Sequence, residues 1–290
     1  MNLLNFSLLF IIILSNGIHR IGSKYYTLKV KNGEFLFSVV NITVPVFVFL
    51  ISGGFRFGFP PSLYGFSAVF VLFYLAAALG VMYSIKEGSL AITSLIISYS
   101  PLIPTVYGLL FLGETPKITL FIGLVFLVIS LVLINIEHRG EEKKITLKWI
   151  IFILLALFGD GIKNVIIKVQ QINYNGLYKN EFLIMSFLVC SIVCLIIVLC
   201  KERENIKVNL KRGIGFSVIC GVATGFINLL ISILSGPKCN MPASIMFPFI
   251  SAGGIISSLL VAVFIFKEKL SKAQISGLIM GIVSIVFLSI

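Results

Sequence analysis

Apolar residues along this chain recur in stretches of roughly 18–25, and short polar breaks separate one stretch from the next. Within a stretch such as 124–134 apolar and polar positions do not alternate, as they would in a transmembrane β-strand. Charged residues and Gly/Pro clusters divide the chain into ten predicted helices, at about residues 3–22, 35–53, 63–84, 88–113, 118–136, 148–169, 181–200, 213–235, 241–266 and 272–290. The pattern therefore predicts an all-α membrane protein with nearly the whole chain in the bilayer.

Composition supports a membrane protein and excludes several other classes. Hydrophobic residues make up 58% of the chain and charged residues 12%, whereas soluble domains carry about 25% charged residues. We therefore exclude a soluble enzyme, a disordered protein and a nucleic-acid-binding protein. Basic loops that face the cytoplasm explain the net charge of +12, so we expect no nucleic-acid partner. The five cysteines form no C-x-x-C pair, and we interpret them as small apolar side chains.

The second half of the chain repeats the pattern of the first. Residues 16–24 align with residues 160–168 at an offset of 144, and 111–114 matches 265–268. Each copy then has a Glu, a Gly nine residues later and a Ser seven residues after that, which are Glu114, Gly123 and Ser130 in the first copy and Glu268, Gly277 and Ser284 in the second. We predict two five-helix repeats, residues 1–136 and 148–290, joined by a loop at 137–147. Because five is odd, the copies cross the membrane in opposite directions, as in the inverted repeats of secondary transporters.

Lys and Arg are distributed unevenly between the predicted connections. The odd-numbered connections carry sixteen of these residues and the even-numbered connections carry five. By the positive-inside rule, the odd-numbered connections face the cytoplasm and both chain ends face outside.

Residues 88–134 carry a characteristic series of small and polar residues. Ser89-Leu-Ala91 begins the fourth helix, Ser98-Tyr-Ser-Pro101 follows within it, and Leu112-Gly-Glu114 precedes a short turn and a helix that contains glycine. This series resembles the EamA-type repeat of the drug/metabolite transporter superfamily. The second copy, residues 243–290, is similar, with Lys267 where the first copy has a glycine. With ten helices, the resemblance spans essentially the whole chain.

The resemblance implies a ten-helix transporter of the cell membrane, either a monomer or a dimer. It also implies a central cavity lined mainly by the first, third, fourth, sixth, eighth and ninth helices. Members of the superfamily are generally drawn with both termini in the cytoplasm, which is the opposite of what the Lys and Arg distribution predicts. Their first helix usually carries Trp-Gly where this chain has Asn16-Gly17.

Charged residues at membrane depth are the strongest candidates for a functional site, because burying one costs about 2.5 kcal/mol or more. Asp160 and Lys163 lie on one helical face and can neutralise each other, with Asn164 close by. They form either an ion pair that stiffens the helix or a site where a charged substrate or a proton competes for one partner. In the first helix, Arg20 either reaches the headgroups or joins this site. His19 either packs against its neighbours or titrates near neutral pH.

Proline and glycine predict interruptions in two matching helices. Pro101 and Pro104 lie within the fourth helix, and Pro248 and the glycines at 253–254 lie within the ninth. Because proline removes a backbone hydrogen bond, breaks at matching positions of two repeats indicate a binding site near the membrane midplane. The alternative is an ordinary kink filled by neighbouring side chains. Side chains near these breaks that could contact a solute are Ser98, Tyr99, Asn228, Phe247 and Ser251.

These residues together make one predicted substrate-binding site. Its candidate members are Asn16, His19, Arg20, Ser98, Tyr99, Asp160, Lys163, Asn164, Asn228, Phe247 and Ser251. Two basic groups, Arg20 and Lys163, against the single acid Asp160 favour a substrate with an anionic or zwitterionic group.

The sequence predicts a secondary-active transporter that moves a small organic metabolite or drug-like solute by alternating access. The sequence contains no phosphate-binding loop and no metal or catalytic cluster, so we expect no enzyme activity, no metal and no cofactor. Two questions stay open, namely coupling to protons and a homodimer through Gly277-x-x-x-Gly281. The alternative function is a non-transporting membrane sensor or scaffold that retains the fold.

Overall fold

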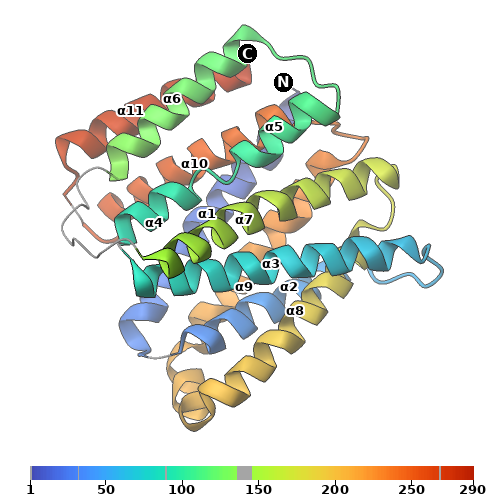
Figure 1. Ribbon diagram of the computed structural model, residues 1–290, viewed down its shortest axis with the longest axis vertical. Coiled ribbons are helices and arrows are strands. Elements are labelled where there is room, and N and C mark those ends of the chain that lie inside the picture. Colours follow the sequence, from blue (N-terminus) through green and yellow to red (C-terminus); the bar gives the residue numbers. More distant parts are fainter. Residues whose placement is uncertain (1, 32, 89, 136–145, 268) are drawn as a thin grey trace.

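The computed structural model describes residues 2–31, 33–88, 90–135, 146–267 and 269–290. Within these ranges ten helical segments are long and apolar enough to cross a membrane, and no strand occurs (Figure 1). Ser89, Glu268 and most of the predicted loop at 137–147 lie outside the described residues. The prediction of an all-α membrane protein is therefore confirmed.

The helices follow one another through short connections. Their bounds are α1 (Leu3–Lys29), α2 (Glu34–Gly53), α3 (Ser62–Glu87), α4 (Leu90–Ile97), α5 (Leu102–Phe111), α6 (Ile118–Asn135), α7 (Leu147–Asn173), α8 (Lys179–Lys201), η2 (Arg203–Asn205), α9 (Ile206–Ser235), α10 (Ala243–Phe264) and α11 (Lys272–Ser289). The largest differences from the predicted bounds are in two helices, since α1 continues seven residues beyond 22 and α9 begins seven residues before 213. The prediction ended these helices at charged side chains, but lysine and arginine can extend from a helix end towards the headgroups without ending it.

Of the two predicted interruptions, the one in the fourth span is confirmed and the one in the ninth is wrong. The fourth span consists of α4 and α5, with a turn at residues 98–101 between them. The ninth span, α10, is one continuous helix through Pro248. Gly253 has a packing role there, because a Cβ atom at this position would lie 2.2 Å from the Ile13 side chain of α1. The glycine therefore allows α1 to approach α10 closely without breaking the helix.

The helices pack in pairs that join the two halves of the chain. α3 runs along α7, α1 runs along α9, and α2 lies against both α8 and α9. α6 and α11 form a separate pair, seen side by side in green and red in Figure 1. The same figure shows both chain ends at the same end of the bundle, as ten crossings require.

Two matching hydrogen bonds join α6 and α11. The Ser130 Oγ donates to the Gly277 carbonyl at 2.6 Å, and the Ser284 Oγ donates to the Gly123 carbonyl at 2.8 Å. Gly281 also faces α6, because a Cβ atom there would lie 3.1 Å from the Ser130 Oγ. The glycine face of α11 is therefore occupied by α6 within the same chain.

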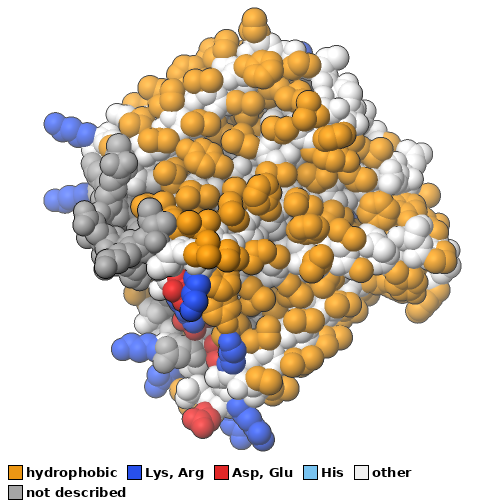
Figure 2. Space-filling model, viewed as in Figure 1, with side chains coloured by type: hydrophobic (Ala, Val, Ile, Leu, Met, Phe, Trp, Pro, Cys, Tyr) orange, Lys and Arg blue, Asp and Glu red, His pale blue; other side chains and the backbone are white. Residues whose placement is uncertain are grey.

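Charged residues gather at one end of the molecule, while apolar side chains cover most of the remaining visible face (Figure 2). We call this end the basic side; it holds the C-terminal ends of α1, α3, α6, α8 and α10. The opposite end, which we call the terminal side, holds both chain ends and the connections after α2, α5, α7 and α9. An apolar belt between two polar ends is the surface expected of a multi-pass membrane protein.

We expect Gly277→Ala to lower the free energy of unfolding by about 1–3 kcal/mol, as overpacking does. An added Cβ would lie 2.6 Å from the Ile134 side chain and 3.1 Å from the Ser130 carbonyl. Thermal unfolding of the purified protein in detergent measures the effect. The matched control is Gly215→Ala in α9, where a Cβ meets open space, so stability should stay equal or rise slightly. Equal losses in the two variants would contradict this packing of α6 on α11.

Candidate functional site

Three adjoining hollows enter the bundle from the basic side. The first, of about 580 Å³, lies between α1 and α10; the second, of about 600 Å³, between α1, α2 and α3. The third, of about 180 Å³, lies deeper between α2, α3 and α7. Ser23 and Thr27 line both the first and the second, and Ser38, Ala78 and Val81 line both the second and the third. We treat the three as one basic-side cavity.

The terminal half of the bundle is filled by an apolar core. Most helices contribute large buried side chains from the half that lies nearer the chain ends, including Leu9, Ile12, Val46, Phe49, Leu63, Phe70, Phe182, Phe187, Leu230, Leu234, Met246 and Phe247. Ile42 belongs both to this core and to the lining of the third hollow, so it marks the boundary between them. In this conformation the centre of the bundle is therefore reached from the basic side and blocked on the terminal side.

The floor of the cavity holds an ion pair at the middle of α7. The Lys163 Nζ lies 2.7 Å from the Asp160 Oδ1, and the Ser100 Oγ donates to the Asp160 Oδ2 at 2.6 Å. The Lys163 ammonium also lies 5.2 Å from the ring centroid of Tyr74. The side chains of Asp160 and Lys163 are 30% and 19% exposed. Both are thus paired but still accessible to a solute in the cavity.

The break in the fourth span explains how Ser100 reaches Asp160. α4 ends at Ile97 because Pro101, which has no backbone N–H, begins a new helix three residues after the turn starts. The turn places Ser100 in the interior, where it is only 3% exposed. In a continuous helix the backbone groups of residues 98–101 would bond along the helix axis, and there would be no turn to place Ser100 in the interior. The predicted break therefore lies beside the predicted charged site.

α1 lines the first hollow with polar side chains from the predicted site. Asn16, His19 and Arg20 all lie on its wall. The imidazole of His19 lies beside the Asn41 side chain of α2, and the Asn41 Oδ1 accepts a hydrogen bond of 2.9 Å from the Thr224 hydroxyl of α9. Within the described ranges Arg20 has no carboxylate partner. Its guanidinium thus adds uncompensated positive charge to the wall of the cavity.

The structure places the other six predicted site residues away from the cavity wall. Ser98 and Asn228 hydrogen-bond to carbonyls of nearby residues in their own spans, Ser94 at 2.7 Å and Thr224 at 2.8 Å. Tyr99 packs beside a small apolar cluster between α6 and α10, and Phe247 belongs to the terminal-half core. Asn164 and Ser251 are half-buried and do not line the cavity. A role for these six in binding remains a prediction.

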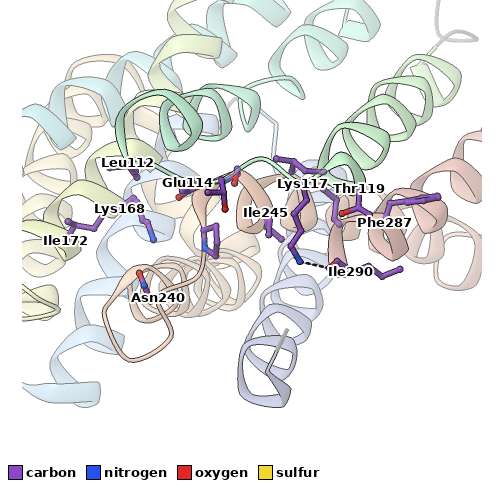
Figure 3. Close-up of a pocket in the computed structure, with 16 residues that line it drawn as sticks. Leu112, Glu114, Lys117, Thr119, Lys168, Ile172, Asn240, Ile245, Phe287 and Ile290 are labelled. Atoms are coloured by element: carbon purple, nitrogen blue, oxygen red, sulfur yellow. Dashed lines mark hydrogen bonds between the residues drawn. The ribbon is translucent and has the colours of Figure 1, made fainter.

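A separate pocket of about 360 Å³ lies on the terminal side, between the end of α5, the start of α10 and the end of α11 (Figure 3). The Glu114 carboxylate accepts hydrogen bonds from the backbone N–H groups of Ala243, at 2.6 Å, and Ser244, at 2.9 Å. The Lys168 Nζ donates to the Met241 carbonyl at 2.7 Å. Lys168 lies within α7 and is only 3% exposed. Among the described residues, none lines both this pocket and the basic-side cavity.

Residues 147–290, which run from α7 to α11, match the EamA-like transporter family. The chain belongs to this family. No curated protein matches it. A protein of known crystal structure is similar over 98% of this chain and 98% of its own, with a TM-score of 0.68 and 15% sequence identity. At that identity the likeness shows the fold alone.

As a member of the EamA-like family, this protein is a multi-pass membrane transporter with a small-molecule substrate. The family match covers the second half of the EamA-like chain, although the motif series that suggested the family from the sequence is clearer in the first half.

Of the polar residues that were not predicted from the sequence of this EamA-like transporter, four lie around the ion pair. They are Ser38, Asn41 and Tyr74, which line the third hollow, and Ser100, which binds Asp160. Asn41 and Tyr74 lie near the middle of apolar spans, and a polar group at that depth is a usable signal. Ser100 had a weaker signal, namely its place in the turn beside Pro101. Nothing in the sequence marks Ser38, which lies in the first turns of α2.

We expect Ser100→Ala to lower the free energy of unfolding by about 1.5–3 kcal/mol, because Asp160 would lose a hydrogen bond to a charged group. Ser98→Ala is the matched control, since Ser98 bonds only to the carbonyl of Ser94 in the same span. Thermal unfolding of the two purified variants gives the comparison. If Ser98→Ala destabilised the protein as much as Ser100→Ala, the hydrogen bond from Ser100 to Asp160 would make no special contribution to the free energy of unfolding.

Proposed function

We propose that this protein is a secondary-active transporter that moves small organic solutes by alternating access. The observation that carries the proposal is the cavity, which opens on the basic side, ends near the membrane midplane at Asp160 and Lys163, and is closed beyond them by an apolar core. Transporters of this kind bind their solute near the midplane and expose the site to one side at a time. The structure then corresponds to the state open to the basic side.

We propose that residues 1–136 and 148–290 are inverted repeats that rock against each other. Two features support this. First, the α6–α11 pair carries two hydrogen bonds that exchange between matching positions, Ser130 to Gly277 and Ser284 to Gly123. Second, the packing of α3 on α7 has its counterpart in the packing of α9 on α1, which is the same pair of helices with the halves exchanged. A pseudo-symmetric molecule can close one side as it opens the other.

The charges of the cavity favour a solute with an anionic or zwitterionic group. Lys163 already neutralises Asp160. The rest of the lining carries three basic side chains and one acidic one, which are Arg20, Lys24, Lys31 and Glu34, so the wall is net positive. A carboxylate or similar group would compete with Asp160 for Lys163. Asp160 would then be free to take up a proton, which is how we propose that transport is coupled to a proton gradient.

A thermal-shift screen of the purified protein tests the proposed solute class. The panel contains organic anions, amino acids, amines, sugars and nucleosides. A ligand at about 100 times its dissociation constant stabilises the folded state by about 2.7 kcal/mol. We expect an anion or zwitterion to stabilise the protein, Arg20→Ala and Asp160→Asn to alter this shift, and Arg203→Ala, which replaces an exposed arginine outside the cavity, to preserve it.

Uptake of the stabilising solute into proteoliposomes completes the test. Accumulation driven by a pH gradient would support the full proposal. Stabilisation only by amines or neutral solutes, unaffected by Arg20→Ala, would contradict the anion preference. Binding with neither uptake nor exchange would contradict transport and favour a sensor that retains the fold.

A further inference from the structure

On the terminal side a half-buried carboxylate, that of Glu114, makes a contact that the proposed solute site does not use. Glu114 follows α5 in the first half of the chain, but its carboxylate binds the first two backbone N–H groups of α10 in the second half. It does so in the space that Gly108 leaves free, because a Cβ atom at Gly108 would lie 2.5 Å from the Glu114 Oε2. The contact thus joins the two halves at their terminal ends, in the pocket where Figure 3 shows Glu114.

Lys168 of α7 contacts the same region, where the chain enters α10. Its ammonium donates to the Met241 carbonyl, in the connection that leads into α10, and it lies within electrostatic reach of Glu114. A buried ammonium is costly unless a carboxylate or a carbonyl compensates it. Lys168 and Glu114 therefore stabilise one arrangement, in which α5, α7 and the start of α10 converge.

This arrangement lies directly beside the core that closes the terminal side. Met241 belongs to that core, and Leu112 and Ile245 both line the terminal-side pocket and pack against the core. Movement of α10 away from α5 and α7 would have to break both contacts before the core could open. Once these groups are exposed, water can replace the hydrogen bonds of the Glu114 carboxylate and of the Lys168 ammonium. Both contacts can therefore break and form again.

We propose that Glu114 and Lys168 form a terminal latch, which holds the terminal side closed while the cavity is open to the basic side and must release for the opposite opening. They act as positioning residues, since neither lines the basic-side cavity. The inference rests on the proposed alternating access. The latch would set the balance between the state open to the basic side and the state open to the terminal side.

Labelling of one cysteine from each side of the membrane tests the latch. The reporter is Ala78→Cys, which lines two hollows of the cavity, in a variant whose five native cysteines are replaced. In vesicles of known orientation, a membrane-impermeant maleimide should label it quickly from the basic side and slowly from the terminal side. With Glu114→Gln we expect labelling from the terminal side to rise about tenfold and labelling from the basic side to fall.

The matched control is Glu202→Gln. Glu202 also accepts hydrogen bonds from the first N–H groups of a helix, those of Phe35 at 3.0 Å and Leu36 at 2.9 Å, but on the basic side. A helix cap with no role in closure would give the same labelling in both variants, and that result would overturn the latch. Lys168→Met removes the other hydrogen bond of the latch, from α7 to the Met241 carbonyl, and carries the test if Glu114→Gln does not fold.

The outcomes separate the latch from the proposed function. If the reporter is labelled from the basic side and neither Glu114→Gln nor Lys168→Met changes its labelling, the latch is overturned and alternating access is not. A reporter that is labelled from neither side in the wild-type background would contradict the open cavity, and with it both proposals.

Discussion

The carboxylate of Asp160 is a charge near the middle of a membrane, and much of the central structure follows from satisfying it. Each of its oxygens has a partner, one from Lys163 on the same helix and one from Ser100 on another span. The second partner requires the fourth span to turn inward at residues 98–101, which divides it into α4 and α5. Burying an ion pair is favourable only when such additional hydrogen bonds are present. The break, the serine and the ion pair therefore form one unit, and a change in any of them affects the other two.

The two ends of the bundle differ because their side chains differ in size and polarity. On the terminal side phenylalanine and leucine from several helices meet and leave no route, whereas on the basic side asparagine, serine, threonine and alanine line open space. The same helices supply both ends, so closure on one side and opening on the other are properties of a single packing arrangement. Interiors packed in this way move between discrete arrangements and do not deform continuously. Such discrete arrangements are the physical basis of the alternating access that we propose for this EamA-like transporter.

Much of the architecture could be predicted from the sequence, because membrane spans follow from local hydrophobicity alone. The ten spans and the broken fourth helix were predicted in this way. The ninth helix was predicted wrongly, because Gly253 serves close contact with Ile13 of α1, and no local pattern distinguishes a packing glycine from a breaking one. Ser100 and Asn41 were missed for a related reason, since their partners lie on helices 60 and 183 residues away in sequence. Arg20, Asp160 and Lys163 were found because a charge within an apolar span stands out in the sequence.

The central claim is that openings on the two sides exclude each other. Pulsed electron spin resonance between paired spin labels tests it most directly, with one pair at Phe57 and Lys238 on the terminal side and one at Lys31 and Lys269 on the basic side, all exposed positions in connections. The account predicts that adding the solute that stabilises the protein most shifts both distance distributions in opposite directions, one side lengthening as the other shortens. A single unchanging distance in both pairs, or lengthening on both sides together, would contradict it.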